Sequence, residues 1–430
     1  AAAPVAPTRF KFWVNAGGYW DLRLDEAIVF SAGTSYGIAG GALTIIAQTG
    51  QQPPAGRYVL ITYDPRAVAY HEQRKFYAGA LTSAFGTVPA SDEQTIIGTN
   101  PGSEILTRFS SPSLATDAVQ FRVASLKRNA IEHLVSLSDL MILTNSAVFV
   151  LRAQGGITPT NVEIKSRSYV GASHVQPAVS DNAVLYAASR GGHIYELRYS
   201  EESGGHIVTD LCRLAPHLFD GHTVRDITYQ EAPYPILWVV RDDFKLLSCA
   251  YNPKLQVIAW HQHETEADIH YVCSIPNGVE DAVFASTARA INGDPGNVLY
   301  SVERLMPLLD EDRDTAIRMD CSLTFEGVDV STVYNLWPLE NQVVKVVADG
   351  AQLGDRTVLE GRIALDVPAD VIHVGLGYQG RLKTLPLTVQ NRSTGAYGVG
   401  YDKNPTRAAF RVVQSAGIKV GPNLAQLTEP

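Results

Sequence analysis

The stretch IEHLVSLSDLMILTNSAVFVL, residues 131–151, decides the fold of this chain. It contains three apolar runs separated by short polar segments, and the runs are rich in Val, Ile, Leu and Phe. Short apolar runs bounded by turn residues are typical of antiparallel β-strands. The pattern therefore predicts a meander of three strands at Ile131–Val135, Leu140–Leu143 and Ala147–Leu151.

The same pattern recurs further along the chain. Comparable units begin at Val175, Ile227 and Tyr271, so successive units start 44 to 52 residues apart. A fifth unit is indicated at Ala67–Ile97. Several short strands repeated about every 40–50 residues are typical of β-propeller blades. An ordinary β-sandwich with irregular hairpins is the alternative.

Each later unit is predicted as three strands: Val175–Val179, Ala183–Tyr186 and His193–Tyr199; Ile227–Tyr229, Ile236–Val240 and Leu246–Tyr251; Tyr271–Ile275, Ala282–Ala285 and Val298–Val302. Within the second unit, period two places Tyr195, Leu197 and Tyr199 on one face and Glu196 and Arg198 on the other. Trp238 and Trp260 lie in apolar strands and are predicted to be core residues.

The chain changes character after Met306-Pro307. The acidic run Asp310–Asp314 indicates a solvated loop at a domain boundary. Clustered carboxylates also suit calcium, although the spacing does not match an EF-hand loop. A short helix is predicted at Arg304–Leu309, and strands are predicted at Val343–Val347, Thr357–Leu365, Val371–Gly375 and Thr406–Val413.

The predicted fold class is all-β, with a β-propeller-like central domain and a smaller C-terminal β-barrel or sandwich domain. The predicted domains are an N-terminal glycine-rich β segment at 1–64, the propeller-like domain at 65–305 and the small β-domain at 306–430. Ala27–Gly56 carries no charged residue, but its glycines and Pro53-Pro54 argue against a membrane span. It is predicted to be a glycine-rich hairpin or extended loop, and a tip loop that touches a membrane or partner is the alternative.

Composition narrows the function. The chain has 430 residues, 18% of them charged, and a net charge of −9, which argues against a protein whose task is to grip nucleic acid. The four cysteines, at 212, 249, 273 and 321, are too few and too dispersed for a disulfide scaffold. Ala1–Pro7 has no methionine and no basic region, which indicates no secretory signal and a processed or truncated chain.

The sequence singles out no catalytic residue. No Walker A loop or His-Glu-x-x-His motif occurs. The nearest metal-like pattern is His261-x-His263 with His270 nearby, because residues 261 and 263 share one face of a strand. A third ligand at suitable spacing is missing, so two partly solvated histidines are the favoured interpretation. We therefore predict no enzyme, no catalytic, cofactor-binding or metal-binding residues, and no cofactor.

One segment carries a resemblance to a known family. Residues 225–265 read RDITYQEAPYPILWVVRDDFKLLSCAYNPKLQVIAWHQHET. The order Tyr-Gln-x-x-Pro at Tyr229–Pro233, Trp-x-Val-x-x-Asp at Trp238–Asp243, then Leu247 and Tyr251, then Ala-Trp-x-x-His at Ala259–His263, resembles the tail nozzle or tail tubular protein B family of short-tailed bacteriophages. Further matches run in the same order: Pro65–Tyr70, Thr158–Asn161, Gly171-Ala172, Gln176-Pro177, Leu211–Gly221, Leu339–Gly350, His373–Leu376 and Leu382–Pro386.

The sequence also departs from that family. An Asp-Gly turn is usual where this chain has Asp243-Phe244, so a longer or differently shaped hairpin is expected there. The 64 residues before Pro65 have no match. The resemblance therefore implies no contacts through the N-terminal region for this chain.

The resemblance implies a structural virion protein of the phage tail. Such proteins form a homo-oligomeric, hexameric ring below the adaptor and portal, and DNA leaves through the lumen without specific binding. The partners implied are adaptor or portal-side tail proteins and tail fibres or spikes, with transient contact to the host envelope. The alternative is a propeller-based receptor-binding adhesin or glycan-cleaving tailspike.

Overall fold

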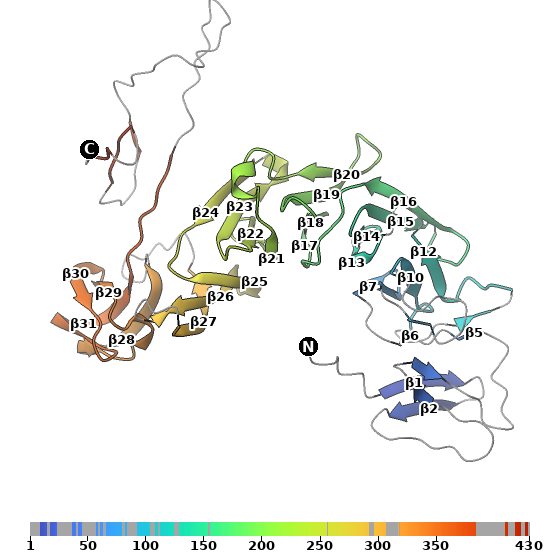
Figure 1. Cartoon of the computed structure of the whole chain (residues 1–430), viewed down its shortest axis with the longest axis horizontal. Coiled ribbons are helices and arrows are strands. Elements are labelled where there is room, and N and C mark those ends of the chain that lie inside the picture. Colours follow the sequence, from blue (N-terminus) through green and yellow to red (C-terminus); the bar gives the residue numbers. More distant parts are fainter. Residues whose placement is uncertain are drawn as a thin grey trace, which may run out of the picture. The chain divides into compact units, whose positions relative to one another are not determined.

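The structure is a computed structural model, shown in Figure 1. It describes residues 9–14, 18–23, 37–39, 42–44, 57–58, 61–62, 66–79, 82–83, 93–103, 108–110, 112–123, 129–153, 155–255, 257–291, 296–306, 317, 319–383, 409–411, 418–422 and 426–428. Residues 1–378 form one compact unit, and residues 379–430 form a second. None of the described helices is long and apolar enough to cross a membrane.

Short antiparallel pairs form near the N-terminus. They join β1 (Arg9–Val14) to β2 (Gly18–Arg23), β3 (Gly37–Ala39) to β4 (Ala42–Thr44), β5 (Arg57–Tyr58) to β11 (Arg108–Phe109), and β6 (Ile61–Thr62) to β9 (Thr82–Ser83). The β3–β4 pair is the hairpin predicted within the glycine-rich segment. The rest of that segment lies outside the described residues.

Antiparallel sheets then follow one another along the chain, and we call them blades one to five (Figure 1). Blade one contains β7 (Ala67–His71), β8 (Arg74–Ala78), β10 (Thr95–Gly98) and β12 (Val119–Arg122). Blade two contains β13 (Ile131–Ser136), β14 (Leu140–Thr144), β15 (Val148–Ala153) and β16 (Val162–Ser168). Blade three contains β17 (Ala178–Ser180), β18 (Ala183–Ala187), β19 (Ile194–Ser200) and β20 (Gly205–Asp210).

The last two blades differ in strand number. Blade four contains β21 (Val224–Gln230), β22 (Ile236–Arg241), β23 (Leu246–Asn252) and β24 (Val257–His263). Blade five has three strands among the described residues, β25 (Asp268–Asn277), β26 (Glu280–Ala290) and β27 (Val298–Leu305). Each sheet pairs its strands in chain order, as propeller blades do. The all-β, propeller-like prediction is therefore confirmed.

Hydrophobic clusters lie between consecutive blades and hold them face to face. Every residue of β14, β18 and β22 is buried, which explains why these strands read as unbroken apolar runs. One core cluster joins each successive pair of blades, containing for example Phe76 and Phe149, Met141 and Tyr186, Leu185 and Leu237, and Trp238 and Val283. Burial of apolar area between adjacent sheets is thus the main stabilising contribution.

The Asp243-Phe244 hairpin between β22 and β23 has a short loop. Phe244 N donates to Arg241 O at 3.1 Å, and Arg241 N donates to Lys245 O at 3.1 Å. Phe244 has φ +61°, a left-handed backbone that favours glycine or asparagine. The missing glycine predicted a longer or differently shaped hairpin. The structure has a three-residue loop in which Phe244 takes the left-handed conformation that a glycine usually adopts.

Substituting Phe244 tests the strain in this turn. Phe244→Gly and Phe244→Ala both remove the ring, but only alanine keeps a Cβ in the left-handed conformation. We expect the glycine variant to have a free energy of unfolding about 1 kcal/mol larger than the alanine variant. Urea denaturation measures this difference, and equal stabilities would contradict a left-handed Phe244.

The C-terminal part of the first unit is a four-stranded antiparallel sheet in the order β28-β31-β29-β30. Its strands are β28 (Asp320–Val333), β29 (Val343–Ala348), β30 (Ala351–Thr357) and β31 (Ile363–Leu376), and they enclose their own apolar cluster, which includes Val346 and Ile372. The predicted strands at 343–347 and 371–375 are confirmed, the latter as part of the longer β31. The strand predicted at Thr357–Leu365 is wrong, because a turn with positive φ at Glu360 and Gly361 separates β30 from β31.

Other sequence predictions have mixed outcomes. The helix predicted at Arg304–Leu309 is wrong at its start, because Arg304 and Leu305 continue the alternating pattern of β27. In the predicted strand Thr406–Val413, the described residues 409–411 are not in a strand. The acidic run at 310–314, with its calcium alternative, lies outside the described residues. The three domain boundaries stay predictions.

Candidate functional site

The family-like segment builds most of blade four. Trp238 Nε1 donates to Gln230 Oε1 at 3.0 Å, which joins the first two quoted motifs across neighbouring strands. Trp260 Nε1 donates to Leu211 O at 2.9 Å, and the Tyr251 hydroxyl donates to Glu196 Oε1 at 2.7 Å. These bonds reach from blade four to blade three. The residues that carry the resemblance therefore hold blade four in place against blade three.

Trp238 and Trp260 differ in burial. Trp238 is buried, as predicted, whereas Trp260 is half-buried against the cluster between blades three and four. The alternation predicted in β19 is confirmed, because Tyr195 and Leu197 pack in one cluster while Glu196 pairs with Leu185 of the next. The half-exposed pattern is not: Glu196 is 3% exposed and Tyr199 is 39% exposed. The burial of Glu196 has no local signal, because the Tyr251 hydroxyl that donates to it lies 55 residues away.

His261 and His263 do share a face of β24, as predicted. Their Nε2 atoms lie 2.7 and 2.8 Å from the Oγ of buried Ser248, whose hydroxyl can donate to one ring and accept from the other. Burial lowers the pKa of His263 to about 4, and neighbouring His261 adds to this effect. Both rings are therefore neutral hydrogen-bonding groups near pH 7.

A different group meets the distance requirement for a metal. Among the described residues, His222, Asp242 and Asp243 are the one set of three potential ligands whose donor atoms all lie within 4.8 Å of each other. These carboxylates already have partners. Asp242 accepts bonds from Thr223 N and Oγ1, both at 3.0 Å, and Asp243 accepts a two-point bond from Arg241. These hydrogen bonds therefore stabilise the β22–β23 loop.

The outer face of blade five is apolar and exposed. We define this outer face by Tyr271, Cys273 and Ile275 of β25 and by Val298, Tyr300 and Val302 of β27. The exposed fractions of Tyr300 and Val302 are 71% and 74%. Tyr271 and Val302 lie in one row, because both pair with Ser286 of β26. Contiguous exposed apolar side chains indicate a protein-protein contact surface.

An arginine lies between aromatic rings at one border of this outer face. The Arg225 guanidinium is 5.1 Å from the Phe244 ring centroid and 5.0 Å from that of Tyr271. Arg225 Nε also donates to His270 O at 3.1 Å. These contacts fix a planar cation beside exposed aromatic rings, an arrangement enriched at protein interfaces.

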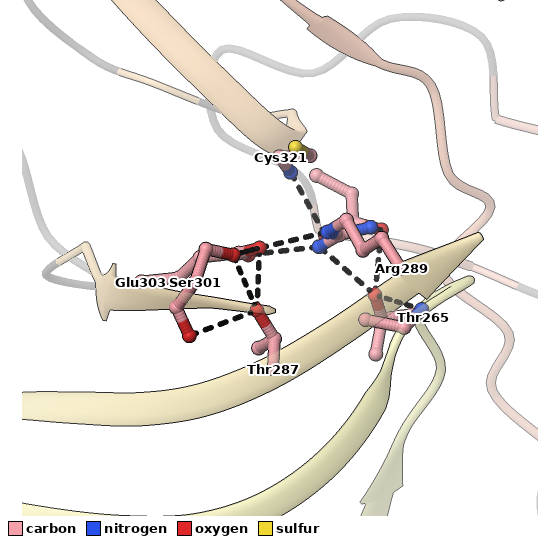
Figure 2. A network of polar contacts seen from close by, with 8 residues as sticks. Thr265, Thr287, Arg289, Ser301, Glu303 and Cys321 are labelled. Carbon is pink, nitrogen blue, oxygen red and sulfur yellow. Dashed lines mark hydrogen bonds and ion pairs between the residues drawn. The ribbon is translucent and has the colours of Figure 1, made fainter. Parts of the chain in front are cut away.

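A polar network lies on the other face of blade five, the inner face, which packs on blade four. This network anchors blade five to β28 (Figure 2). Arg289 Nε and Nη2 donate to Glu303 at 2.7 and 2.8 Å, and Nη2 also donates to Asp320 Oδ1 at 2.9 Å. Thr287 Oγ1 donates to Glu303 Oε1 at 2.8 Å, and Thr265 Oγ1 donates to Asp320 Oδ2 at 2.7 Å. The Arg289 side chain is 7% exposed, so this ion pair is shielded from water.

A second polar anchor lies between blades three and four. His193 Nδ1 is 2.9 Å from Asp210 Oδ2, and its Nε2 is 3.2 Å from Asp220 Oδ1. Burial lowers the pKa of His193, but the bonds to the two carboxylates outweigh that effect and raise it above 6.5. The ring therefore ties β20 to the loop that follows η1 (Pro216–Leu218).

Replacing this histidine predicts a pH-dependent loss of stability. A raised folded-state pKa stabilises the fold fully below the unfolded value of about 6.5, and the stabilisation is lost as pH rises through the folded value. We expect the Tm difference between the unchanged chain and His193→Gln to be larger at about pH 6 than at about pH 9. Thermal unfolding at both pH values measures it. A difference that grows with pH would contradict the ion pairs.

The prediction that the chain has no catalytic residue overlooked two glycine motifs in the sequence. Gly33-Thr34-Ser35-Tyr36-Gly37 has the spacing of a nucleophile elbow, but residues 33–36 lie outside the described part. Gly375–Gly380 has the spacing Gly-x-Gly-x-x-Gly at the end of β31. Its sheet is antiparallel and residues 377–383 are not helical, so the strand-helix context of a dinucleotide fingerprint is missing there.

The inter-blade contacts and the outer face of blade five were also missed. His193 meets Asp220 across 27 residues, and Arg225 meets Tyr271 across 46 residues. Alternation in Val298–Val302 was the available signal for an exposed apolar row. It did not show which side of the strand faces solvent.

No protein-family model and no curated protein matches this chain. Solved structures with similar folds include the WD40 domain of SCAP from fission yeast, at 11% identity and TM-score 0.31, covering 86% of this chain and 96% of that one. Chaetomium thermophilum Raptor matches at 12% identity and TM-score 0.35, covering 76% of this chain and 29% of that one. YCF48 bound to D1 peptide matches at 9% identity and TM-score 0.32, covering 56% of this chain and 64% of that one. These similarities concern the fold alone.

Proposed function

We propose that the protein is a structural subunit of a bacteriophage tail, a nozzle-type protein whose copies form a hexameric ring through which DNA leaves the particle. The observation that carries the proposal is the ordered resemblance over residues 225–265. The adaptor or portal-side proteins above the ring and the tail fibres or spikes beside it are the proposed partners. The proposed location is the virion tail.

The positions of the family-like residues support this proposal. Gln230, Trp238, Tyr251 and Trp260 make hydrogen bonds within blade four or from blade four to blade three. A sequence pattern that serves blade packing is expected of a structural subunit, whereas a catalytic pattern would converge on a cleft.

The surface of the protein also supports it. The outer face of blade five offers exposed apolar side chains, and ring closure requires such surfaces to make head-to-tail contacts. The net charge of −9 suits a conduit, because like charge weakens adhesion of the phosphate backbone. At physiological salt this repulsion acts over about 8 Å, so passing DNA is affected mainly close to the wall.

Native mass spectrometry of the purified full chain tests the ring. We expect a species of six times 46.6 kDa, and we expect duplex DNA not to be retained by it at physiological salt. A chain that stays single at all accessible concentrations would contradict the ring. Tight, salt-sensitive DNA binding would contradict a passive conduit.

A receptor-binding adhesin or glycan-cleaving tailspike is the second candidate. It is favoured by exposed Tyr271 and Tyr300, whose rings offer apolar faces beside the Arg225 cation. Glycan binding by the full chain, abolished by Tyr271→Ala and Tyr300→Ala together, would support the adhesin. Glycan cleavage lost on a single Asp or Glu substitution would support the tailspike.

A further inference from the structure

We propose that the free edge of β27 takes up strand β1 from a second copy of this chain, which completes blade five with a fourth strand. This inference rests on the proposed function, because it requires copies to assemble. It adds the segment that is exchanged and the edge that receives it.

Blade five lacks one strand in the described part of the chain. Blades two, three and four each have four strands, with the last strand added to the edge of the third. In blade five, β27 is the third strand, and all eight of its residues pair with β26 on one side only. An unpaired edge of eight residues is about 26 Å long and presents backbone donors and acceptors to an incoming strand.

The side chains of β27 suit a strand with alternating character. Val298, Tyr300 and Val302 are exposed on the outer face, whereas Ser301 and Glu303 point to the inner face and join the Arg289 network. An incoming strand would extend the exposed apolar row and cover part of it. Burial of these side chains would contribute about 25 cal/mol per Å² of apolar area.

Strand β1 also has an unpaired edge in the described part of the chain. Among the described residues it pairs with β2 alone, in a two-stranded sheet, and two-stranded hairpins by themselves are marginally stable in water. Its sequence RFKFWV alternates cationic Arg9 and Lys11 with apolar Phe10 and Phe12. A third strand on its free side would stabilise the hairpin.

Charge complementarity favours this donor. On the inner face, the cation of Arg289 is shared between the carboxylates of Glu303 and Asp320, so this group carries one negative charge in excess. A register that pairs residue 10 with Val302 sets residue 9 or residue 11, both cationic in the sequence, opposite Glu303. Opposite charges on adjacent strands stabilise pairing by about 0.2–1 kcal/mol per pair.

A second copy is the occupant that a ring requires. An N-terminal strand donated to the last blade of the neighbouring copy is a head-to-tail contact, because donor and acceptor are different surfaces. Repetition of the same contact closes a ring without a two-fold interface. Main-chain hydrogen bonds would give such a joint affinity, and the alternating side chains would give it register.

The test uses the full chain and a synthetic peptide of residues 9–23, with Phe10→Lys/Phe12→Lys as the control peptide. We expect excess peptide to convert the multi-chain species into single chains of 46.6 kDa that carry one peptide each, and the control peptide to have no effect. The full-chain variant Tyr300→Lys/Val302→Lys, altered only at exposed positions, is expected to keep its urea unfolding curve and to stay single without binding peptide.

The outcomes separate this inference from the proposed function. A multi-chain species that survives both the peptide and the lysine variant would overturn the strand exchange and leave the ring standing. If the unchanged chain is single but binds the peptide through β27, the edge of β27 does accept a strand. The same result would contradict both the donation of that strand by a second copy and the ring. A single chain that binds no peptide would overturn both.

Discussion

Arg289→Met is expected to lower the free energy of unfolding by about 3 kcal/mol, because it leaves two carboxylates close together without their cation. The Arg289 side chain is 7% exposed, and those of its partners Glu303 and Asp320 are 25% and 19% exposed. Water therefore replaces the lost ion pairs incompletely. Equilibrium urea unfolding measures the change.

Arg304→Met is the matched control. Arg304 lies on β27 beside Glu303, its side chain is 36% exposed, and its ion pair with Glu280 spans 2.8 Å at the surface. Exposed ion pairs contribute about 0.2–1 kcal/mol, so this variant should lose little stability. Equal losses in the two variants would show that the Arg289 network does not anchor blade five to β28.

The Arg289 effect also has a predicted pH dependence. Burial raises the pKa of Glu303, but the hydrogen bonds and charge of Arg289 outweigh that effect and lower it below 4.5. A lowered folded-state pKa stabilises the fold above the unfolded value and loses this contribution as pH falls through the folded value. The stability difference between the unchanged chain and Arg289→Met should therefore shrink below about pH 4.

Phe219→Ala is expected to cost about 3–5 kcal/mol, which is typical when a fully buried aromatic residue is truncated. Phe219 is 1% exposed and lies in the cluster that joins blades three and four. Its ring meets Trp260 edge to face, with centroids 4.7 Å apart. Removing it leaves a cavity at the blade junction, and urea unfolding again measures the loss.

Leu214→Ala is the control for this second variant. Leu214 belongs to the same loop and is 90% exposed, so its truncation should change stability by less than about 0.5 kcal/mol. A small effect of Phe219→Ala would contradict the packing of blade three on blade four. It would also remove the structural role assigned to Trp260.

The blades could be predicted from sequence because their central strands are buried on both faces. The residues of β14 and β22 are apolar runs, and such runs identify strands without any knowledge of their neighbours. The fourth strands were harder. β16 reads VEIKSRS, and its residues are exposed or half-buried. It is held mainly by pairing with β15, which leaves little apolar signal in its own sequence.

The burial of charged side chains could not be predicted from the sequence. Glu196 and Arg289 are inside because Tyr251 and Asp320 supply their partners from 55 and 31 residues away. Without those partners, the ordinary expectation is that such side chains face water. The His261-His263 pair was foreseen on one face, since strand alternation is local, but the buried Ser248 between the two rings was not.

Cryo-electron microscopy of intact particles, with this chain located in the density, tests the nozzle proposal. The nozzle proposal predicts a closed ring on the tail axis beneath the portal, and the strand exchange predicts density from one copy that continues the edge of β27 in the next. Copies found off the axis, at the periphery of the tail, would contradict the nozzle proposal and favour the adhesin.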